Sequence, residues 1–187
     1  VEPDNILHCQ AKFLKDLFTP IKEKCLGLLT GNHEEKVHSA YQENFTKNLC
    51  TDLNVPYGGY SCFLMLHFHR GDHRRLYKVH AWHGAGASQT EGARIMRLMR
   101  LVNDVEADIY FMGHLHAIAE YSPDRLTCND GHIKSESLVA LITGSWLKTY
   151  AQGSIPSYGE RSGYKPSRIG CPVVYIMPDK DKLWVEA

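Results

Sequence analysis

The sequence has no excess of either charge. Its 187 residues include 21 Lys and Arg against 21 Asp and Glu, so the formal net charge at neutral pH is zero. A chain without a net positive field does not attract long polyanions by charge alone. Charge therefore does not indicate nucleic acid or a nucleotide as a partner, although it leaves both open as substrates.

Paired cysteines and long apolar runs are also absent. The six cysteines are scattered along the chain without a C-x-x-C pair. This distribution argues against a zinc knuckle or a dense disulfide framework and is typical of a reducing compartment, so we expect a cytoplasmic, intracellular protein. No run of about 18 apolar residues occurs, and we expect no membrane span and no membrane partner. The length suffices for one core, which predicts a single domain over residues 1–187; the sequence does not define the oligomeric state.

Histidine, in contrast, is abundant, with 11 residues. Its side chain commonly binds metals and titrates nearest to neutral pH, so this number favours metal or acid–base chemistry. Three segments that contain histidine share one pattern, in which a short β-type run ends at a glycine next to a histidine. They are residues 28–34 (LLTGNHE), 79–84 (VHAWHG) and 111–116 (FMGHLH). Strand ends of this kind can bring imidazole and amide side chains to one edge of a sheet.

The hydrophobic pattern predicts a mixture of buried strands, hairpins and a few helices, which indicates an α/β or α+β layered fold. Helices are expected over residues 1–24, 35–54 and 88–103. Strands are expected over residues 25–29, 61–68, 76–82, 107–112, 138–143, 173–177 and 182–186. The second and third of these strands are expected to form a hairpin, as are the last two. Residues 150–170, rich in Gly, Ser, Tyr and Pro, are expected to form a long surface loop.

The expected helix of residues 88–103 follows a glycine-rich loop. Ser88 is expected to cap it, with Glu91 three residues later completing a capping box. Its expected buried stripe consists of Ile95, Leu98, Met99 and Val102. Three basic residues are expected to face solvent: Arg94, Arg97 and Arg100.

The three histidine segments, in this order, resemble the calcineurin-like metallophosphoesterase family, whose later motifs read Gly-Asn-His-(Asp/Glu), a His beside Gly, and Gly-His-x-His. The resemblance implies an α/β sandwich of two sheets flanked by helices. It also implies a hydrolase that cleaves a phosphoester substrate with a dinuclear metal centre and a metal-bound hydroxide. Two divalent ions about 3.5–4 Å apart clamp a phosphoryl group and neutralise transition-state charge. Manganese is the expected metal, with Fe, Zn, Ni or Co as alternatives.

Carried over residue by residue, the resemblance implies two sets of metal ligands: Asn32, His83 and His114 for one ion, and His116 for the other. His33 is the implied catalytic residue, placed beside the substrate phosphate, where it stabilises the transition state or protonates the leaving oxygen. Glu34 is the expected acceptor that orients a histidine.

Alternation along the strands bears on the choice among the histidines. A period of two puts His83 on one face of its strand and His80 on the other. His83 also adjoins the glycine-rich loop, where the family's ligand lies, so we favour His83 and expect His80 in the second shell or in the core. His114 and His116 are two residues apart, and on an extended segment they point to the same side.

Two motifs of the family, Asp-x-His and Gly-Asp-x-x-Asp, do not occur ahead of residues 31–34. In the family they supply two ligands of the first ion and the carboxylate that bridges both ions. We therefore expect the chain to be the C-terminal part of a longer protein, with the N-terminal strands of the sheet missing. The alternative is a non-catalytic metal-binding or interaction module derived from the same fold.

Overall fold

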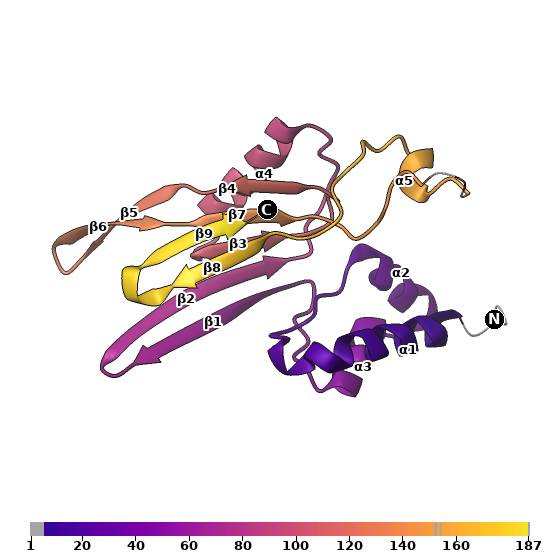
Figure 1. Ribbon diagram of the computed structural model, residues 1–187, viewed down its shortest axis with the longest axis horizontal. Coiled ribbons are helices and arrows are strands. Elements are labelled where there is room, and N and C mark those ends of the chain that lie inside the picture. The colour runs from indigo at the N-terminus through magenta and orange to yellow at the C-terminus, as the bar shows by residue number, and fades with distance from the viewer. Residues whose placement is uncertain (1–5, 152, 154, 187) are drawn as a thin grey trace. The chain divides into compact units, whose positions relative to one another are not determined.

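A computed structural model describes residues 6–151, 153 and 155–186. The chain divides into two compact units, Val1–Cys62 and Phe63–Ala187, which are described one at a time (Figure 1). This division does not test the prediction of a single domain, because one domain can contain two such units.

The first unit is helical. Its elements are α1 (Ile6–Phe18), the 3-10 helix η2 (Thr19–Lys24), α2 (Asn32–Tyr41) and α3 (Phe45–Leu53). The single helix expected over residues 35–54 is therefore wrong. It is interrupted where Gln42 adopts a left-handed φ of 57° and ends α2. Asn44 then caps α3 by accepting a hydrogen bond from the Lys47 backbone N–H at 2.9 Å.

The strand expected over residues 25–29 does not form. Leu28 makes only an isolated bridge to Tyr57, through hydrogen bonds from Leu28 N to Pro56 O (3.1 Å) and from Gly58 N to Leu28 O (2.9 Å). Leu26 is 56 % exposed. The apolar run is thus not buried on both faces, because only a short loop pairs with it within this unit.

The second unit contains a five-stranded mixed sheet in the order β1-β2-β3-β7-β4. These strands are β1 (Ser61–Arg70), β2 (His73–Trp82), β3 (Ile109–Met112), β4 (Ile118–Tyr121) and β7 (Val139–Thr143). β2, β3 and β7 run parallel, while β4 is antiparallel to β7. The expected hairpin is confirmed as β1 and β2, which turn at Gly71 with a φ of 56°.

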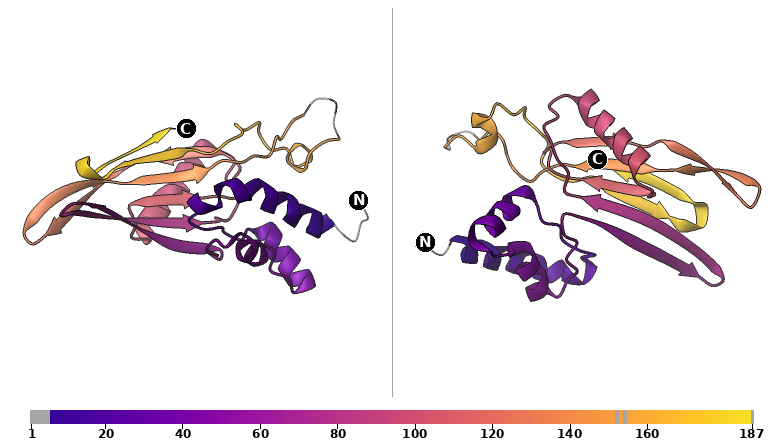
Figure 2. Two further views of the ribbon diagram at one scale, coloured as in Figure 1. Left: turned by 60° about the horizontal axis from the view of Figure 1, so that its bottom comes forward. Right: turned by 180° about the vertical axis from the view of Figure 1, so that it is seen from behind.

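The helix α4 (Glu91–Asp104) packs on β3, β4 and β7 and covers one face of the sheet (Figure 2). Its buried residues Leu98, Leu101 and Val102 join Tyr110 and Met112 of β3 in one core cluster. The expected helix is confirmed, but its details differ.

Thr90, not Ser88, caps α4 by accepting a hydrogen bond from the Ala93 N–H at 3.3 Å. Met99 of the expected buried stripe is 41 % exposed, and Leu101 is buried in the core. The helix is therefore rotated slightly from the expected orientation.

Two ribbons complete the unit: β5 (Asp124–Asn129) with β6 (His132–Ser137), and β8 (Val173–Met177) with β9 (Lys182–Glu186). The second confirms the expected C-terminal hairpin, whose strands are joined by the 3-10 helix η3 (Pro178–Lys180). It lies on the side of the sheet away from α4, with β9 in contact with β7 (Figures 1 and 2). In the described part of residues 150–170, the expected surface loop, there is one short helix, α5 (Tyr158–Arg161). This segment is called the late loop below.

The observed architecture confirms the expected mixed α/β layering. Of the three parallel strands, β3 and β7 are buried on both faces: residues facing α4 alternate with Ile109, Val139 and Leu141, each at most 2 % exposed. Within the described ranges, no helix is both long and apolar enough to cross a membrane.

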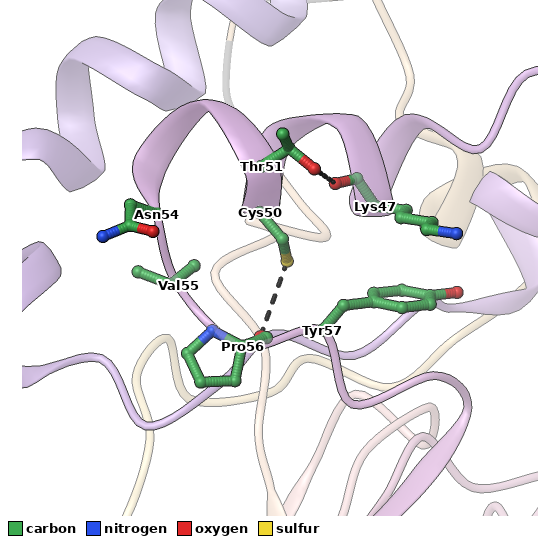
Figure 3. A pocket seen from close by; sticks show the side chains of 7 residues that line it. All are labelled: Lys47, Cys50, Thr51, Asn54, Val55, Pro56 and Tyr57. Atoms are coloured by element: carbon green, nitrogen blue, oxygen red, sulfur yellow. Dashed lines mark hydrogen bonds between the residues drawn. The ribbon is translucent and has the colours of Figure 1, made fainter.

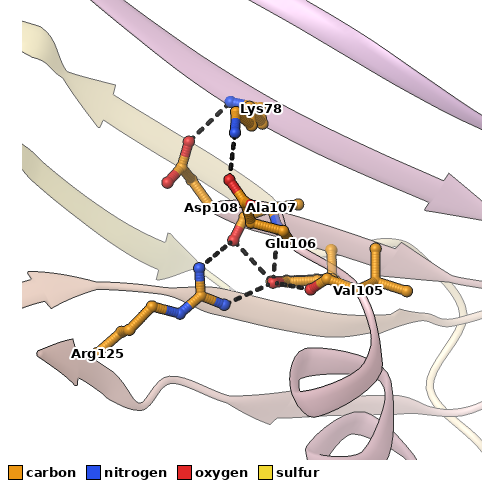
Figure 4. A network of polar contacts seen from close by, with 7 residues as sticks. Lys78, Val105, Glu106, Ala107, Asp108 and Arg125 are labelled. Atoms are coloured by element: carbon orange, nitrogen blue, oxygen red, sulfur yellow. Dashed lines mark hydrogen bonds and ion pairs between the residues drawn. The ribbon is translucent and has the colours of Figure 1, made fainter. Parts of the chain in front are cut away.

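A polar network holds the connection from α4 to β3 (Figure 4). The Tyr110 hydroxyl, fully buried, lies 2.7 Å from the carbonyl oxygens of Val105 and Ala107 and can donate to either. It accepts hydrogen bonds from the Ala107 N–H at 2.9 Å and from Arg125 Nη2 at 3.1 Å. The Tyr110 hydroxyl is therefore a hydrogen-bond partner for several backbone groups in the turn that precedes β3.

Replacing Tyr110 with Phe should destabilise the protein by about 1–3 kcal/mol, because the turn then keeps buried polar groups without a partner. Urea unfolding followed by tryptophan fluorescence measures the change. Tyr175→Phe is the matched control, since the Tyr175 hydroxyl donates to Glu186 at 2.7 Å on the surface, and little change is expected. Equal effects of the two substitutions would contradict this account.

Candidate functional site

The parallel strands β2 and β3 place two of the histidine segments side by side. In their register Trp82 pairs with Met112, and the Gly113 N–H donates to the Trp82 carbonyl at 3.1 Å. His83 and His114 therefore leave the sheet at the same edge, where the carboxyl ends of parallel strands meet.

At that edge the two imidazole rings are in contact. Nδ1 of His114 lies 3.3 Å from Nε2 of His83, and the ring centroids are 5.2 Å apart at an interplanar angle of 73°. Both residues are half-buried. Both were expected at one metal site; the structure brings the two side chains together within this unit, and their role as metal ligands stays a prediction.

Glycine makes this close approach possible. Gly84 has a φ of 90°, and a Cβ atom placed on it would lie 2.9 Å from the Gly113 carbonyl oxygen. A Cβ atom on Gly113 would in turn lie 3.0 Å from the His83 carbonyl oxygen. Both glycines of the histidine motifs are thus required by backbone contact between β2 and β3, independently of any ligand.

The segment after Gly113 is not extended. His114 and His116 both adopt left-handed φ values, of 68° and 49°, and the Leu115 N–H turns back to the Gly113 carbonyl at 2.9 Å. The extended geometry expected for this motif is wrong. Left-handed non-glycine residues cost free energy and are enriched at functional sites.

His116 contacts an aromatic residue of the late loop. Its ring packs edge-on against Tyr164, with centroids 6.4 Å apart and an interplanar angle of 83°. Tyr164 also accepts a hydrogen bond on its carbonyl from the Tyr150 hydroxyl at 2.8 Å. Tyr164 was not expected at the site from the sequence. The one feature that could have indicated it is its aromatic side chain within a polar loop.

Three predicted site residues, Asn32, His33 and Glu34, lie in the first unit, at the start of α2. His33 is exposed, and Asn32 and Glu34 are half-buried. The Glu34 carboxylate accepts a hydrogen bond from the Gly31 N–H at 2.9 Å, which caps the helix. The expected roles of these residues stay predictions, because each unit is described by itself.

His80 lies in the core of the second unit, 6 % exposed. Its ring contacts those of Phe63 (centroids 4.9 Å apart) and Tyr110 (6.4 Å). Burial lowers the pKa of His80 below its ordinary value of 6.5. His80 therefore lies in the core, which is one of the two placements expected for it from the sequence.

The His83 and His114 nitrogens are spaced as two ligands of one ion would be. Two nitrogens bound at about 2.0–2.1 Å to a tetrahedral ion lie about 3.3–3.4 Å apart, and the observed separation is 3.3 Å. The donor set, imidazole nitrogen, suits Mn, Fe, Zn, Ni or Co. Among the described residues, no group of three or more His, Cys, Asp and Glu side chains is arranged to hold a metal.

A pocket in the first unit contains none of the predicted site residues (Figure 3). Its lining consists of Lys47, Cys50, Thr51, Asn54, Val55, Pro56 and Tyr57. Burial raises the pKa of the Cys50 thiol, and the nearby Cys25 raises it further. Cys50 donates to the Pro56 carbonyl at 3.6 Å, so its thiol contributes to holding the segment after α3.

Replacing Gly84 with Ala tests the backbone contact beneath the histidine pair. The expected loss of stability is about 1–3 kcal/mol greater than for Gly131→Ala. Gly131 has a similar φ of 78°, but a Cβ atom placed on it would have no neighbour within 4 Å, so this control isolates the steric term. Urea unfolding of both variants gives the difference, and equal losses would show that the contact at Gly84 is not tight.

His80 should make the protein less stable in acid. Because its folded pKa is lowered, the unfolded chain binds more protons below about pH 6.5, and stability present above that pH is lost as the pH falls towards the folded pKa. Between pH 7.5 and 5.5 the wild type should lose more unfolding free energy than His80→Phe, by at most about 1.4 kcal/mol per pH unit. Urea unfolding at both values measures this.

The control for that experiment is His67→Phe, since His67 is exposed on β1. Its substitution should leave the pH dependence of the wild type unchanged. If His80→Phe also leaves it unchanged, His80 is not the group that couples protonation to unfolding.

In comparisons with known proteins, no family model matches the chain, and neither a curated protein nor a solved structure matches it. The residues and geometry described above are therefore the basis for a functional proposal.

Proposed function

We propose that the protein is a metal-dependent hydrolase of phosphoesters of the calcineurin-like metallophosphoesterase type. The observation that supports it is the pair His83 and His114, whose ring nitrogens lie 3.3 Å apart at the ends of two parallel strands. The order of the three histidine motifs along the sequence is the second support, and two of these motifs supply the pair.

In this proposal His83 and His114 hold one divalent ion, with Asn32 as a third ligand and His116 at a second ion. Manganese is the proposed metal, with Fe, Zn, Ni or Co as alternatives. When bound, the two ions supply positive charge to the phosphoryl oxygens and activate water. The half-buried position of His83 and His114 limits solvent around them, which strengthens charge interactions at the site.

The start of α2 holds the residue proposed to act on the phosphate. The carboxylates of Glu34 and Glu35 also lie in this first turn, and Glu34 accepts the hydrogen bond from the Gly31 N–H, so the protein's own carboxylates already engage this helix end. His33 lies in that turn and is exposed, so its imidazole is accessible to solvent and substrate. We assign to it the proton that the leaving oxygen receives.

The proposed fold is the two-sheet sandwich of the same family. The mixed sheet, with α4 on one side and the β8–β9 ribbon on the other, supports it. The motifs Asp-x-His and Gly-Asp-x-x-Asp do not occur ahead of Gly31 in this sequence. The chain therefore supplies more of the ligands proposed for the ion at His83 and His114 than of those proposed for the second ion.

His114→Ala should abolish metal binding at the histidine pair. Calorimetric titration with Mn²⁺ and Zn²⁺ should give saturable binding to the wild-type chain and at least tenfold weaker binding to the variant. Hydrolysis of p-nitrophenyl phosphate and bis-p-nitrophenyl phosphate should require the same metal and be lost in His114→Ala and in His33→Ala.

His69→Ala is the matched control, because His69 is an exposed histidine on β1. It should leave both metal binding and turnover unchanged. Metal binding without turnover would favour the non-catalytic module over the enzyme. Turnover that both His33→Ala and His114→Ala retain would rule out the proposed site.

A further inference from the structure

Two arginines of α4 are bound to the loop that follows His83. Arg94 Nε donates to the Ser88 backbone carbonyl at 3.1 Å, and Arg97 Nε donates to the Ser88 hydroxyl at 2.6 Å. Both arginines are half-buried, and Ser88 is only 8 % exposed. The sequence expectation that Arg94 and Arg97 face solvent is wrong, because the loop folds over this part of the helix.

The loop is shaped around the Arg97 guanidinium. Gly86 has a φ of 83°, and a Cβ atom on it would lie 2.2 Å from Arg97 Nη2 and 2.8 Å from Cζ. The guanidinium thus occupies the space that any side chain at Gly86 would need. The hydrogen bond to the Ser88 hydroxyl holds the Arg97 side chain beside Gly86.

Among the described residues, no carboxylate forms an ion pair with the guanidinium of Arg94 or Arg97. Their hydrogen bonds to Ser88 use Nε alone. The Nη groups of each arginine keep the paired N–H donors with which guanidinium binds phosphate in a bidentate manner.

These donors lie at the same edge of the sheet as the histidine pair. Because β2 and β3 are parallel, α4 runs back between them, and its first turns lie where β2 ends. Gly86, which contacts Arg97, is three residues after His83, a span of at most about 10 Å. The N-terminal end of the helix dipole adds to the positive potential there.

We propose that Arg94 and Arg97 bind a second phosphoryl group of the substrate, beside the one held at His83 and His114. This inference rests on the proposed function and narrows its substrate class. The substrate is then a phosphoester that carries a second phosphoryl group.

The test measures binding of inorganic pyrophosphate to the metal-free chain by isothermal titration calorimetry at low salt. The wild type should bind saturably. Arg97→Gln and Arg94→Gln should each weaken binding about tenfold to a hundredfold, since each removes charge-assisted hydrogen bonds. Arg97→Lys should give an intermediate loss, because it keeps the charge without the planar fork.

Arg100→Gln is the matched control, since it removes the same charge from an exposed position of the same helix. It should change the affinity less than twofold. Absence of saturable binding to the wild type would overturn the proposal, as would equal losses in Arg97→Gln and Arg100→Gln. If Arg97→Gln does not fold, Ser88→Ala serves instead: it retains both arginines but frees Arg97, and an unchanged affinity would count against the site.

The same experiment separates this site from the proposed reaction. Pyrophosphate binding needs no metal, so His114→Ala should bind it like the wild type. Binding that depends on Arg97 in a chain without turnover would support the arginine site and count against the enzyme. Turnover that depends on His114 in a chain that does not bind pyrophosphate would overturn the arginine site alone.

Discussion

The close contact between the ends of β2 and β3 is the constraint on which the candidate site depends. Parallel pairing brings His83 and Gly113 to one edge, and the lack of a side chain at Gly84 and Gly113 lets the two backbones touch. Only then do the imidazoles of His83 and His114 reach 3.3 Å. Gly84 and Gly113 therefore have a packing role that needs no ligand. The pairing of β2 and β3 sets the positions of His83 and His114.

Much of the fold was predictable because its strongest elements have long, regular patterns. The β1–β2 hairpin and α4 combine ten or more residues of consistent periodicity, and β3 and β7 are continuous apolar runs. The short run at Cys25–Leu29 is equally apolar but lacks a partner strand within its unit, and sequence periodicity does not reveal partners. Ser88 and Thr90 are both good helix caps, and the choice between them depends on Arg97, which takes the Ser88 hydroxyl.

The candidate site was predictable where it depends on strand order and not where it depends on loop conformation. His83 and His114 follow neighbouring parallel strands, so their meeting follows from topology. The turn at Leu115 does not, because the left-handed φ values at His114 and His116 are uncommon for non-glycine residues and the sequence pattern does not indicate them. The contact of His116 with Tyr164 joins residues far apart in the sequence, and the hydrogen bond from Arg97 to Ser88 spans nine residues. Neither contact follows from local periodicity.

The loop from Gly84 to Ser88 contacts both the end of β3 and two arginines of α4. Its first residue presses against Gly113, its middle residue receives the Arg97 guanidinium, and its last residue holds both arginines of α4. The backbone that positions His83 is thus the same backbone that positions Arg97. An anion bound at the proposed arginine site would therefore lie against a loop that contacts β3, and only a few peptide units would separate it from His83.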